Sequence, residues 1–523
     1  MKCKSCCSLY SCKKQGTVNV EEEGTSKCEK GIFVFVVVVS FAAIIWLYCW
    51  SIASNDSDNV NFFLFQQLKS WFNWYVLLLA ISVIIAAYML LLMVSALVDC
   101  VMDRALVLFC CHKVFVVVCL IIIVMGFILL NMFYPEEWLA INASFEMTGL
   151  FMQISAMVVM VFTAWYLALV LRKISKPCYK VSIYFVYSIV FLFIFTIPTW
   201  WFSSCVTSDL RTKPLLIGHR GAPTVAPENT LMSFEIAASC GAYGFESDIR
   251  FSSDGVPFVM HDDDLLRTTD VADKFPQRKN DRAETFSWAE LQLLNAGEWF
   301  LRTDPFLTGR FLNDEDKANI TNQKIPSLLE FALLTSRHDM MMMFDVYPPP
   351  RNHTNHLDYF NVTIDILLKS GISQKSVFWL YGKTDLAPNF TLVSPDPNES
   401  GIGLLNLLFS TVTSKIVESN TSVISYTINE GWAFSRAWCQ GVWAVTTDYC
   451  STFAKMTKPS WTLSRPEFLA TWITIDIVCL LAVLVIFIYF HKKPTGVDTA
   501  VEVFPSTFTI DTVAASVVQL NDL

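Results

Sequence analysis

Residues 215–261 read LLIGHRGAPTVAPENTLMSFEIAASCGAYGFESDIRFSSDGVPFVMH and decide the fold of the second half of this chain. The apolar run 215–217 ends at a glycine, which predicts a buried strand that leads into a loop. Pro227 and the polar residues after it open a helix. Two further strands are predicted over 245–251 and 257–260. The stretch therefore predicts strands that alternate with helices.

The same stretch places five chemically active side chains at or after strands. His219 and Arg220 follow the first strand, and His261 follows the third. Because strand side chains alternate between faces, Glu246 and Asp248 point the same way. Two carboxylates directed into one interior are unfavourable unless a cation compensates them, and oxygen ligands favour Mg²⁺ or Ca²⁺. The structural alternative is an ion-paired strand beside core histidines.

Several short motifs occur in a fixed order along this region. They are His-Arg-Gly at 219–221, Pro-Glu-Asn-Thr at 227–230, Glu-x-Asp at 246–248, Asp-Gly-x-Pro-x-x-x-His-Asp at 254–262, Leu-Arg-Thr-Thr at 266–269, Asn-Ala-Gly-x-Trp-Phe at 295–300, Ile-Pro-Ser-Leu at 325–328 and Gly-Val-Trp-Ala-Val-Thr-Thr-Asp at 441–448. In these motifs the chain resembles the glycerophosphodiester phosphodiesterase family. The resemblance implies a metal-dependent hydrolase of glycerophosphodiesters, whose substrates include glycerophosphoinositol and glycerophosphocholine.

The resemblance also implies a role for each candidate residue. One divalent cation, Ca²⁺ or Mg²⁺, is expected on Glu246, Asp248 and Asp345, the last standing where the family usually has a glutamate. Arg220 is expected to contact the phosphate. His219 and His261 are expected to form the acid–base pair, with the two roles unassigned. The nucleophile implied is a neighbouring hydroxyl of glycerol or inositol, which gives a cyclic phosphate that water then opens.

One position departs from the family pattern. Tyr347 stands where many members carry a lysine near the phosphate, and a tyrosine donates a hydrogen bond without adding positive charge. This departure leaves a second hypothesis open, a surface signalling or adhesion protein that turns substrate over poorly. Cleavage of glycosylphosphatidylinositol anchors or of lysophospholipids at the membrane surface is a further alternative.

The composition is that of a membrane protein with a large water-soluble part. Apolar residues make up 54% of the chain and charged residues 16%. Six apolar segments reach the roughly 20 residues that cross a bilayer; they lie at about 32–53, 75–97, 114–133, 147–171, 181–204 and 468–490. Asp476 is almost the only polar group that these segments offer to a channel or transporter. The net charge of −9 argues against a nucleic-acid partner.

Basic residues predict the orientation. They gather in the second and fourth connections and after the last segment, at Arg104, Lys113, Arg172, Lys173, Lys176, Lys180, Lys492 and Lys493. The positive-inside rule therefore predicts a cytosolic Cys-rich N-terminus (1–30), five spans within 31–204, an extracellular domain (205–467), a sixth span and a cytosolic tail (491–523) in the plasma membrane. Glycosylation sequons fall only in segments assigned outside, at Asn55, Asn142, Asn319, Asn352, Asn361, Asn389, Asn398 and Asn420.

The extracellular domain is predicted to be a (β/α)₈ barrel. Its length is close to the roughly 250 residues of that fold, and strands are expected at 215–217, 244–251, 256–260, 340–346, 377–381, 401–408, 423–428 and 442–447. Residues 262–324 are predicted to be an insertion over the barrel mouth. Cys205, Cys240, Cys439 and Cys450 permit three disulfide connectivities, among which the sequence does not choose. The oligomeric state is likewise not indicated.

Overall fold

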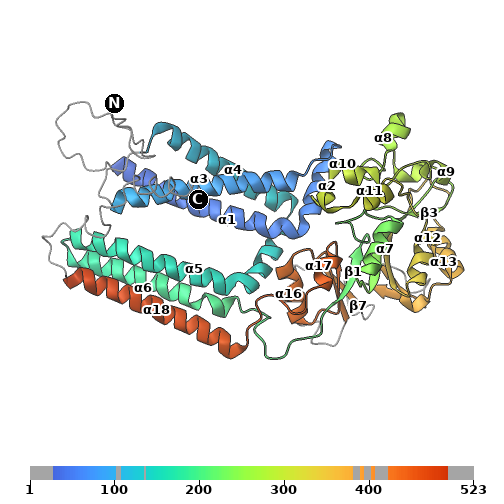
Figure 1. The fold of residues 1–523 in the computed structure, drawn as a ribbon. Coiled ribbons are helices and arrows are strands. Elements are labelled where there is room, and N and C mark those ends of the chain that lie inside the picture. Colours follow the sequence, from blue (N-terminus) through green and yellow to red (C-terminus); the bar gives the residue numbers. More distant parts are fainter. Residues whose placement is uncertain are drawn as a thin grey trace, which may run out of the picture.

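The computed structural model describes residues 27–101, 108–134, 137–380, 389–393, 402–406 and 422–492. The chain forms a set of long helices at one end and a mixed α/β domain at the other (Figure 1). Six helices are long and apolar enough to cross a membrane. They are α1 (Lys27–Ile52), α3 (Trp74–Val101), α4 (Cys110–Phe133), α5 (Glu137–Lys173), α6 (Pro177–Trp200) and α18 (Arg465–Lys492). These helices coincide with the six predicted segments.

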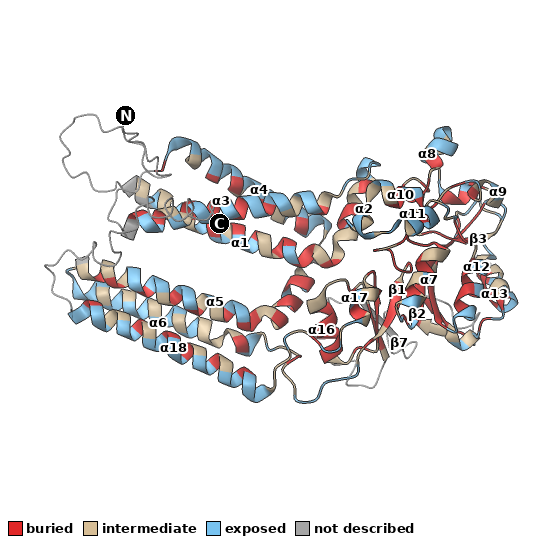
Figure 2. Ribbon diagram, in the orientation of Figure 1, coloured by how far each residue is buried: buried red, intermediate tan, exposed pale blue. Residues whose placement is uncertain are grey.

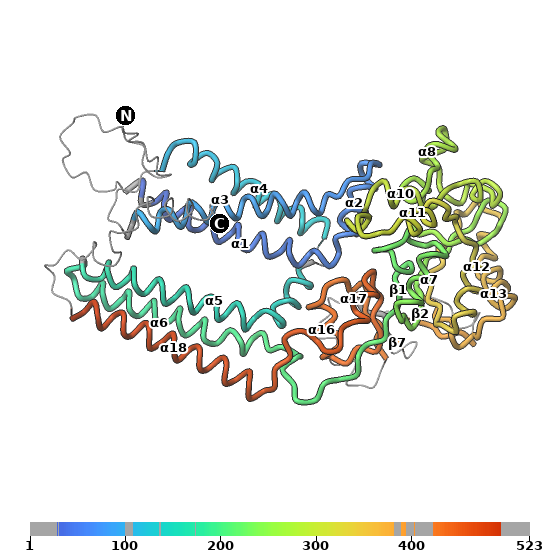
Figure 3. Tube along the Cα trace, in the orientation of Figure 1, coloured from blue at the N-terminus to red at the C-terminus, as the bar shows by residue number. Residues whose placement is uncertain are grey.

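The long helices pack in two groups. Helix α1 packs against α3 and α4, and α5 packs against α6 and α18, as the tube view in Figure 3 also shows. Much of their surface is exposed (Figure 2), and it carries large apolar side chains such as Ile84, Phe162 and Phe185, as expected of helices that face lipid. Asp476 of α18 accepts a hydrogen bond from Gln153 of α5. This residue therefore joins two helices.

The first connection and the beginning of α5 lie on the same side of the helices as the barrel (Figure 1). The first contains η1 (Ala53–Asp56) and α2 (Ser57–Leu68), and Asn55 donates a hydrogen bond to the carbonyl of Thr427. Near the third connection, Glu146 of α5 forms an ion pair of 2.9 Å with Arg436 of α16 (Gly431–Gln440). These contacts fit the predicted alternation of the spans.

The α/β domain contains one sheet with eight parallel strands among the described residues. Its order is β6-β5-β4-β2-β1-β9-β8-β7. The bounds are β1 (Leu215–His219), β2 (Gly244–Phe251), β4 (Met341–Val346), β5 (Val377–Leu380), β6 (Thr391–Val393), β7 (Ile402–Asn406), β8 (Ser422–Tyr426) and β9 (Ala444–Thr447). The domain is TIM-barrel-like, as predicted.

Side-chain alternation divides the apolar core into two layers. Met341 and Met343 lie with Ile217 and Ile424 in a cluster within the sheet, whereas Met342 belongs to the layer beneath the helices. The covering helices are α7 (Leu231–Ser239), α12 (Leu328–Arg337), α13 (Tyr359–Ser370), α16 and α17 (Cys450–Ala454). Both layers hold the strand ends in place.

One predicted barrel strand is wrong. Residues 257–259 form β3 (Pro257–Val259), which pairs antiparallel with β2 and lies off the barrel path. The turn around Gly255 is too short for a parallel connection, which needs a crossover of a dozen or more residues. The strand missing from the prediction is β6, which is only three residues long.

The insertion after β3 folds as short helices with a small core of its own. They are α8 (Val271–Lys274), η2 (Pro276–Arg278), η3 (Ala283–Thr285), α9 (Trp288–Leu291), α10 (Glu298–Thr303), η4 (Gly309–Phe311) and α11 (Asp314–Ile320). Phe258, Leu265, Phe286 and Leu294 pack within it. Thr308 donates a hydrogen bond of 2.6 Å to the carbonyl of Thr224 in the loop after β1, so the insertion borders the barrel mouth.

The structure selects one of the three disulfide connectivities that the sequence left open. Cys205 pairs with Cys439 across a sequence separation of 234 residues, whereas Cys240 and Cys450 are free thiols. The bond links the segment that leaves α6 to α16 of the barrel. It therefore ties the barrel to the helical part of the chain.

The predicted glycosylation sites differ in accessibility. Asn142, Asn319, Asn352, Asn361 and Asn389 are exposed, and Asn398 and Asn420 lie outside the described residues. Asn55 is 4% exposed, and its Nδ2, the atom that would carry a glycan, donates to the Thr427 carbonyl. A glycan on Asn55 does not fit this packing.

Candidate active site

Strand β1 delivers the first two candidate residues in a constrained turn. Arg220 has a left-handed backbone (φ 53°), and its N–H donates to the carbonyl of Glu246 at 3.0 Å and to its Oε2 at 3.2 Å. Gly221 follows with φ 94°, and a Cβ at this position would meet Ser233. The His-Arg-Gly motif is therefore a turn that fixes the Arg220 backbone against Glu246.

The parallel register gathers the predicted carboxylates at the same end of the sheet. His219 on β1 lies beside Glu246 on β2, and Asp248 lies beside Asp345 on β4. Glu246 and Asp248 are both buried. The carboxyl ends of the strands are where TIM barrels carry their active sites.

The Nδ1 nitrogen of His219 contacts a carboxylate. Its Nδ1 lies 2.6 Å from Asp448 Oδ1, and its Nε2 lies 3.9 Å from Glu246 Oε2. Asn429 donates a hydrogen bond of 2.6 Å to the other oxygen of Asp448. Burial opposes the charged imidazolium, but the Asp448 carboxylate outweighs it, and the pKa of His219 is raised to about 9.

His261 has a similar partner in a different electrostatic setting. Its Nδ1 lies 2.9 Å from Asp262 Oδ1, and both oxygens of Asp262 accept hydrogen bonds of 2.7 Å from Arg267. Burial opposes ionisation of Asp262, but Arg267 more than offsets it and holds the pKa of Asp262 well below its usual range. Arg267 thus neutralises the carboxylate that holds His261, whereas Asp448 has an amide in the corresponding place.

Arg220 lies within a network of carboxylates. Its Nη1 donates to Glu228 Oε1 at 3.1 Å, and its Nε lies 3.8 Å from Asp248 Oδ2. Neither Arg220 Nε nor Asp248 Oδ2 has a hydrogen-bond partner among the described residues, although both atoms are buried. This donor and this acceptor are therefore still available to bind a ligand.

The carboxylate set fits a hard divalent cation. Burial, with the charge of Asp248, raises the pKa of Glu246 to about 7 and that of Asp345 to about 6. A cation would relieve this repulsion, and carboxylate oxygens are ligands of Ca²⁺ and Mg²⁺. Among the described residues, however, no three such groups already converge as an ion would require. Binding therefore needs side-chain movement in Glu246, Asp248 or Asp345.

Tyr347 contributes to this network without a positive charge. Its hydroxyl donates to Asp248 Oδ1 at 3.4 Å, and its ring lies 4.5 Å from the guanidinium carbon of Arg250. Burial raises the pKa of Tyr347 well above its ordinary value, so it is a neutral donor. Arg250 itself pairs with Glu284 of the insertion at 2.8 Å.

Comparison with known proteins decides the family. The model of the glycerophosphoryl diester phosphodiesterase family matches residues 219–452. The glycerophosphoinositol inositolphosphodiesterase GDPD2 of Mus musculus is 34% identical over 519 residues, with 96% of each chain covered. The chain belongs to this family. It is an enzyme, a glycerophosphodiester phosphodiesterase.

Other members of the family are similar over most of their length. The glycerophosphodiester phosphodiesterase domain-containing protein 5 of Gallus gallus is 32% identical over 506 residues, which cover 93% of this chain and 84% of that one. A solved phosphodiesterase of Oleispira antarctica aligns with a TM-score of 0.38 and 23% identity, over 46% of this chain and 95% of that one.

Several residues of the phosphodiesterase site were not predicted. Asp448 and Asp262 stand in quoted motifs, directly after β9 and directly after His261, so their positions at strand ends were available from the sequence. Glu228 and Arg267 also stand in quoted motifs, but their ion pair of 2.6 Å joins loops 39 residues apart. Phe62 packs edge-to-face on His261, with ring centroids 5.1 Å apart. It belongs to α2, and nothing in the sequence relates it to the barrel.

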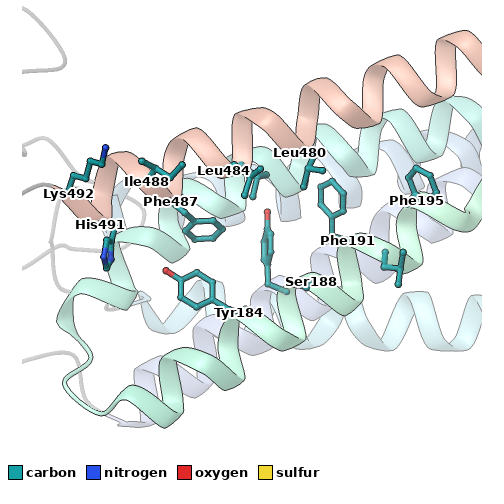
Figure 4. A pocket seen from close by; sticks show the side chains of 13 residues that line it. Tyr184, Ser188, Phe191, Phe195, Leu480, Leu484, Phe487, Ile488, His491 and Lys492 are labelled. Carbon is teal, nitrogen blue, oxygen red and sulfur yellow. The ribbon is translucent and has the colours of Figure 1, made fainter.

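A large pocket lies far from these residues. It has a volume of about 890 Å³ between α6 and α18 and is lined mainly by aromatic and aliphatic side chains, among them Phe191, Leu484 and Phe487 (Figure 4). Both helices are long and apolar enough to span a membrane. None of the residues that line this pocket is a candidate catalytic residue.

Proposed function

We propose that this protein hydrolyses glycerophosphodiesters at the outer face of the plasma membrane, with glycerophosphoinositol as the first substrate to test and glycerophosphocholine as the second. The observation that carries the proposal is the pair of histidines, each held by a carboxylate on Nδ1, beside the partly unsatisfied guanidinium of Arg220. The printed name of the mouse relative supports the choice of glycerophosphoinositol.

The different partners of the two histidines support different roles for them. Asp448 contacts His219 with an amide on its other oxygen and so favours protonated His219, whereas Arg267 offsets the charge of Asp262 beside His261. We therefore assign His219 as the general acid that protonates the leaving alkoxide, and His261 as the general base that takes the proton of the attacking hydroxyl. Arg220 binds the phosphate oxygens through its planar fork.

Glu246, Asp248 and Asp345 would hold one divalent cation. When bound, Ca²⁺ or Mg²⁺ would neutralise charge that develops on the phosphate oxygens. The backbone N–H of Arg220 fixes Glu246 on one side, and Tyr347 donates to Asp248 on the other. These contacts orient the carboxylates toward the phosphate site.

A disulfide bond and exposed glycosylation sequons support an extracellular location of the barrel. The Cys205–Cys439 disulfide is typical of an oxidising compartment, and five predicted glycosylation sites are exposed. Protease added to intact cells, with epitope tags at both termini, tests the orientation. Digestion of the barrel with both tags retained supports the proposal, and loss of either tag contradicts it.

A membrane-tethered diester, such as a glycosylphosphatidylinositol anchor, is the second candidate substrate. It is favoured by the contact of Phe62 with His261, because this contact turns the mouth of the barrel toward the membrane helices. Cells that express the protein or His261→Ala are given both soluble diesters, with and without EDTA, and released products and released anchored proteins are identified. Products that require His261 establish the activity. No release of any kind from wild-type cells refutes it.

A further inference from the structure

The first membrane connection is built into the mouth of the barrel. Helix α2 continues past the predicted end of the first span and lies beside the insertion (Figure 1). Its leading end is fixed by Ser54, whose hydroxyl donates to Glu430 Oε1 at 2.6 Å. Its other end is fixed by Lys69, whose Nζ lies 2.8 Å from Asp264 Oδ2. Contacts at both ends hold α2 in one position over the site.

A chain of hydrogen bonds joins this connection to His219. Asn55 Oδ1 accepts from the backbone N–H of Asn429 at 2.9 Å and of Glu430 at 3.2 Å. The side-chain Nδ2 of Asn429 donates to the carbonyl of Asn55 at 3.2 Å and to Asp448 Oδ2 at 2.6 Å. Asp448 in turn holds His219. The position of α2 is therefore coupled to that of the carboxylate that positions His219.

Two residues one turn apart on α2 face the catalytic groups. Phe62 contacts His261, and its ring lies 5.3 Å from the guanidinium carbon of Arg267. Residues four apart share a helix face, so Asp58 points the same way. Burial raises the pKa of the Asp58 carboxyl, and the charged groups that also act on it are Arg267, Glu228, Arg220 and Asp448.

Asp58 lies in the first turn of α2. Among the described residues it has no hydrogen-bond or ion-pair partner, whereas Glu228, Asp262 and Asp448 beside it are all bonded. A carboxylate held beside a phosphate site by both ends of its helix, with acceptor oxygens to spare, is suited to bind part of the substrate.

We propose that Asp58 completes the active site by accepting hydrogen bonds from hydroxyl groups of the alcohol esterified to the phosphate, with Phe62 as the adjacent wall. The inference rests on the proposed phosphodiesterase function and adds a residue that would bind the alcohol part of the substrate. The first membrane connection thus supplies a specificity-determining residue to a barrel that lies more than a hundred residues later in the sequence.

The surroundings favour hydroxyl donors over a quaternary ammonium group. An ammonium ion binds best to a free aromatic face, but the Arg267 guanidinium already lies over the ring of Phe62. A second cation here would also lie beside Arg220 and Arg267. Neutral hydroxyls satisfy the carboxylate of Asp58 without adding positive charge.

The test compares Asp58→Asn and Asp58→Ala with Gln67→Ala, a control at an exposed position of the same helix. Full-length protein in detergent is assayed on glycerophosphoinositol and glycerophosphocholine. Because a hydrogen bond to a charged group contributes about 1.5–3 kcal/mol, kcat/KM for glycerophosphoinositol should fall roughly 10- to 100-fold, mainly through KM, in both Asp58 variants. Gln67→Ala should match the wild type.

The outcomes separate the hypotheses. An equal loss on both diesters supports the proposal and places the contact on the shared glycerol, and a larger loss on glycerophosphoinositol places it on inositol. An unchanged KM in both variants, or a loss confined to glycerophosphocholine, overturns it. Inactive wild-type protein refutes the proposed function instead.

A measurement on the wild type alone guards against variants that misfold. Asp58 should favour the phosphate ester of the alcohol that it contacts, so inositol 1-phosphate or glycerol 3-phosphate should inhibit the wild type more strongly than phosphocholine, which has no hydroxyl group. Inhibition by phosphocholine that equals or exceeds that of both other esters contradicts the proposal.

Discussion

Glu246→Gln is predicted to stabilise the barrel when metal is absent. Burial and the charge of Asp248 raise the pKa of Glu246 to about 7, from an ordinary value of 4.5. In the folded state Glu246 therefore binds a proton more tightly than in the unfolded state. The contribution of Glu246 to the free energy of unfolding therefore falls as pH rises from about 4.5 to about 7, because ionisation of the buried side chain destabilises the fold.

The magnitude follows from the size of the shift. Each pKa unit corresponds to about 1.4 kcal/mol, so ionised Glu246 destabilises the metal-free fold by about 3 kcal/mol at pH 8 and by about 1 kcal/mol at pH 5. Glutamine keeps the oxygen that accepts from the Arg220 N–H and removes the charge. The variant should therefore gain about 3 kcal/mol at pH 8 and much less at pH 5.

Hydrogen exchange of peptides that cover β2 and β4, in EDTA at the two pH values, measures this local stability. Glu228→Gln is the matched control because burial opposes ionisation of Glu228 but Arg267 and Arg220 lower its pKa to about 2. That carboxylate stabilises the fold above pH 4.5, so its removal should reduce protection at pH 8. Reduced protection in Glu246→Gln at pH 8, or an equal gain at both pH values, would refute the reasoning.

Three further predictions concern the catalytic pairs, the cation and the disulfide. His219→Ala and His261→Ala should each lower kcat at least about 100-fold with unchanged surface expression. Asp448→Asn should move the alkaline loss of activity to lower pH, because His219 loses the carboxylate that raises its pKa. A pH profile that does not move contradicts this assignment. Added Ca²⁺ or Mg²⁺ should raise the unfolding temperature more at pH 8 than at pH 5, because the carboxylates that bind the ion must be ionised. Asp248→Asn should abolish this rise. A rise of equal size in that variant would show that Asp248 is not a metal ligand. Cys439→Ser should destabilise the barrel by up to roughly 5 kcal/mol, because the bond closes a loop of more than 200 residues. Denaturant unfolding compares this variant with Cys240→Ser, which keeps the disulfide. Equal stability of the two variants would show that the bond does not stabilise the barrel.

Local sequence patterns were enough to predict most of the candidate site residues. Glu246 and Asp248 are on one strand, so period-two alternation sufficed to place them on one face. His219, Arg220 and His261 stand at the ends of predicted strands, and parallel strands end at a common edge. The six apolar segments depend only on local composition and length. Each of these inferences uses residues close together in the chain.

Tertiary structure alone decided everything that depends on contacts between distant segments. The antiparallel direction of β3 follows from its pairing with β2, which an apolar run does not specify. The difference between the two histidines arises because Arg267 reaches Asp262, whereas Asn429 reaches Asp448. The Cys205–Cys439 pair and the contact of Phe62 with His261 join residues about 200 or more positions apart. Local patterns carry no information on such pairs, because chain packing brings them together.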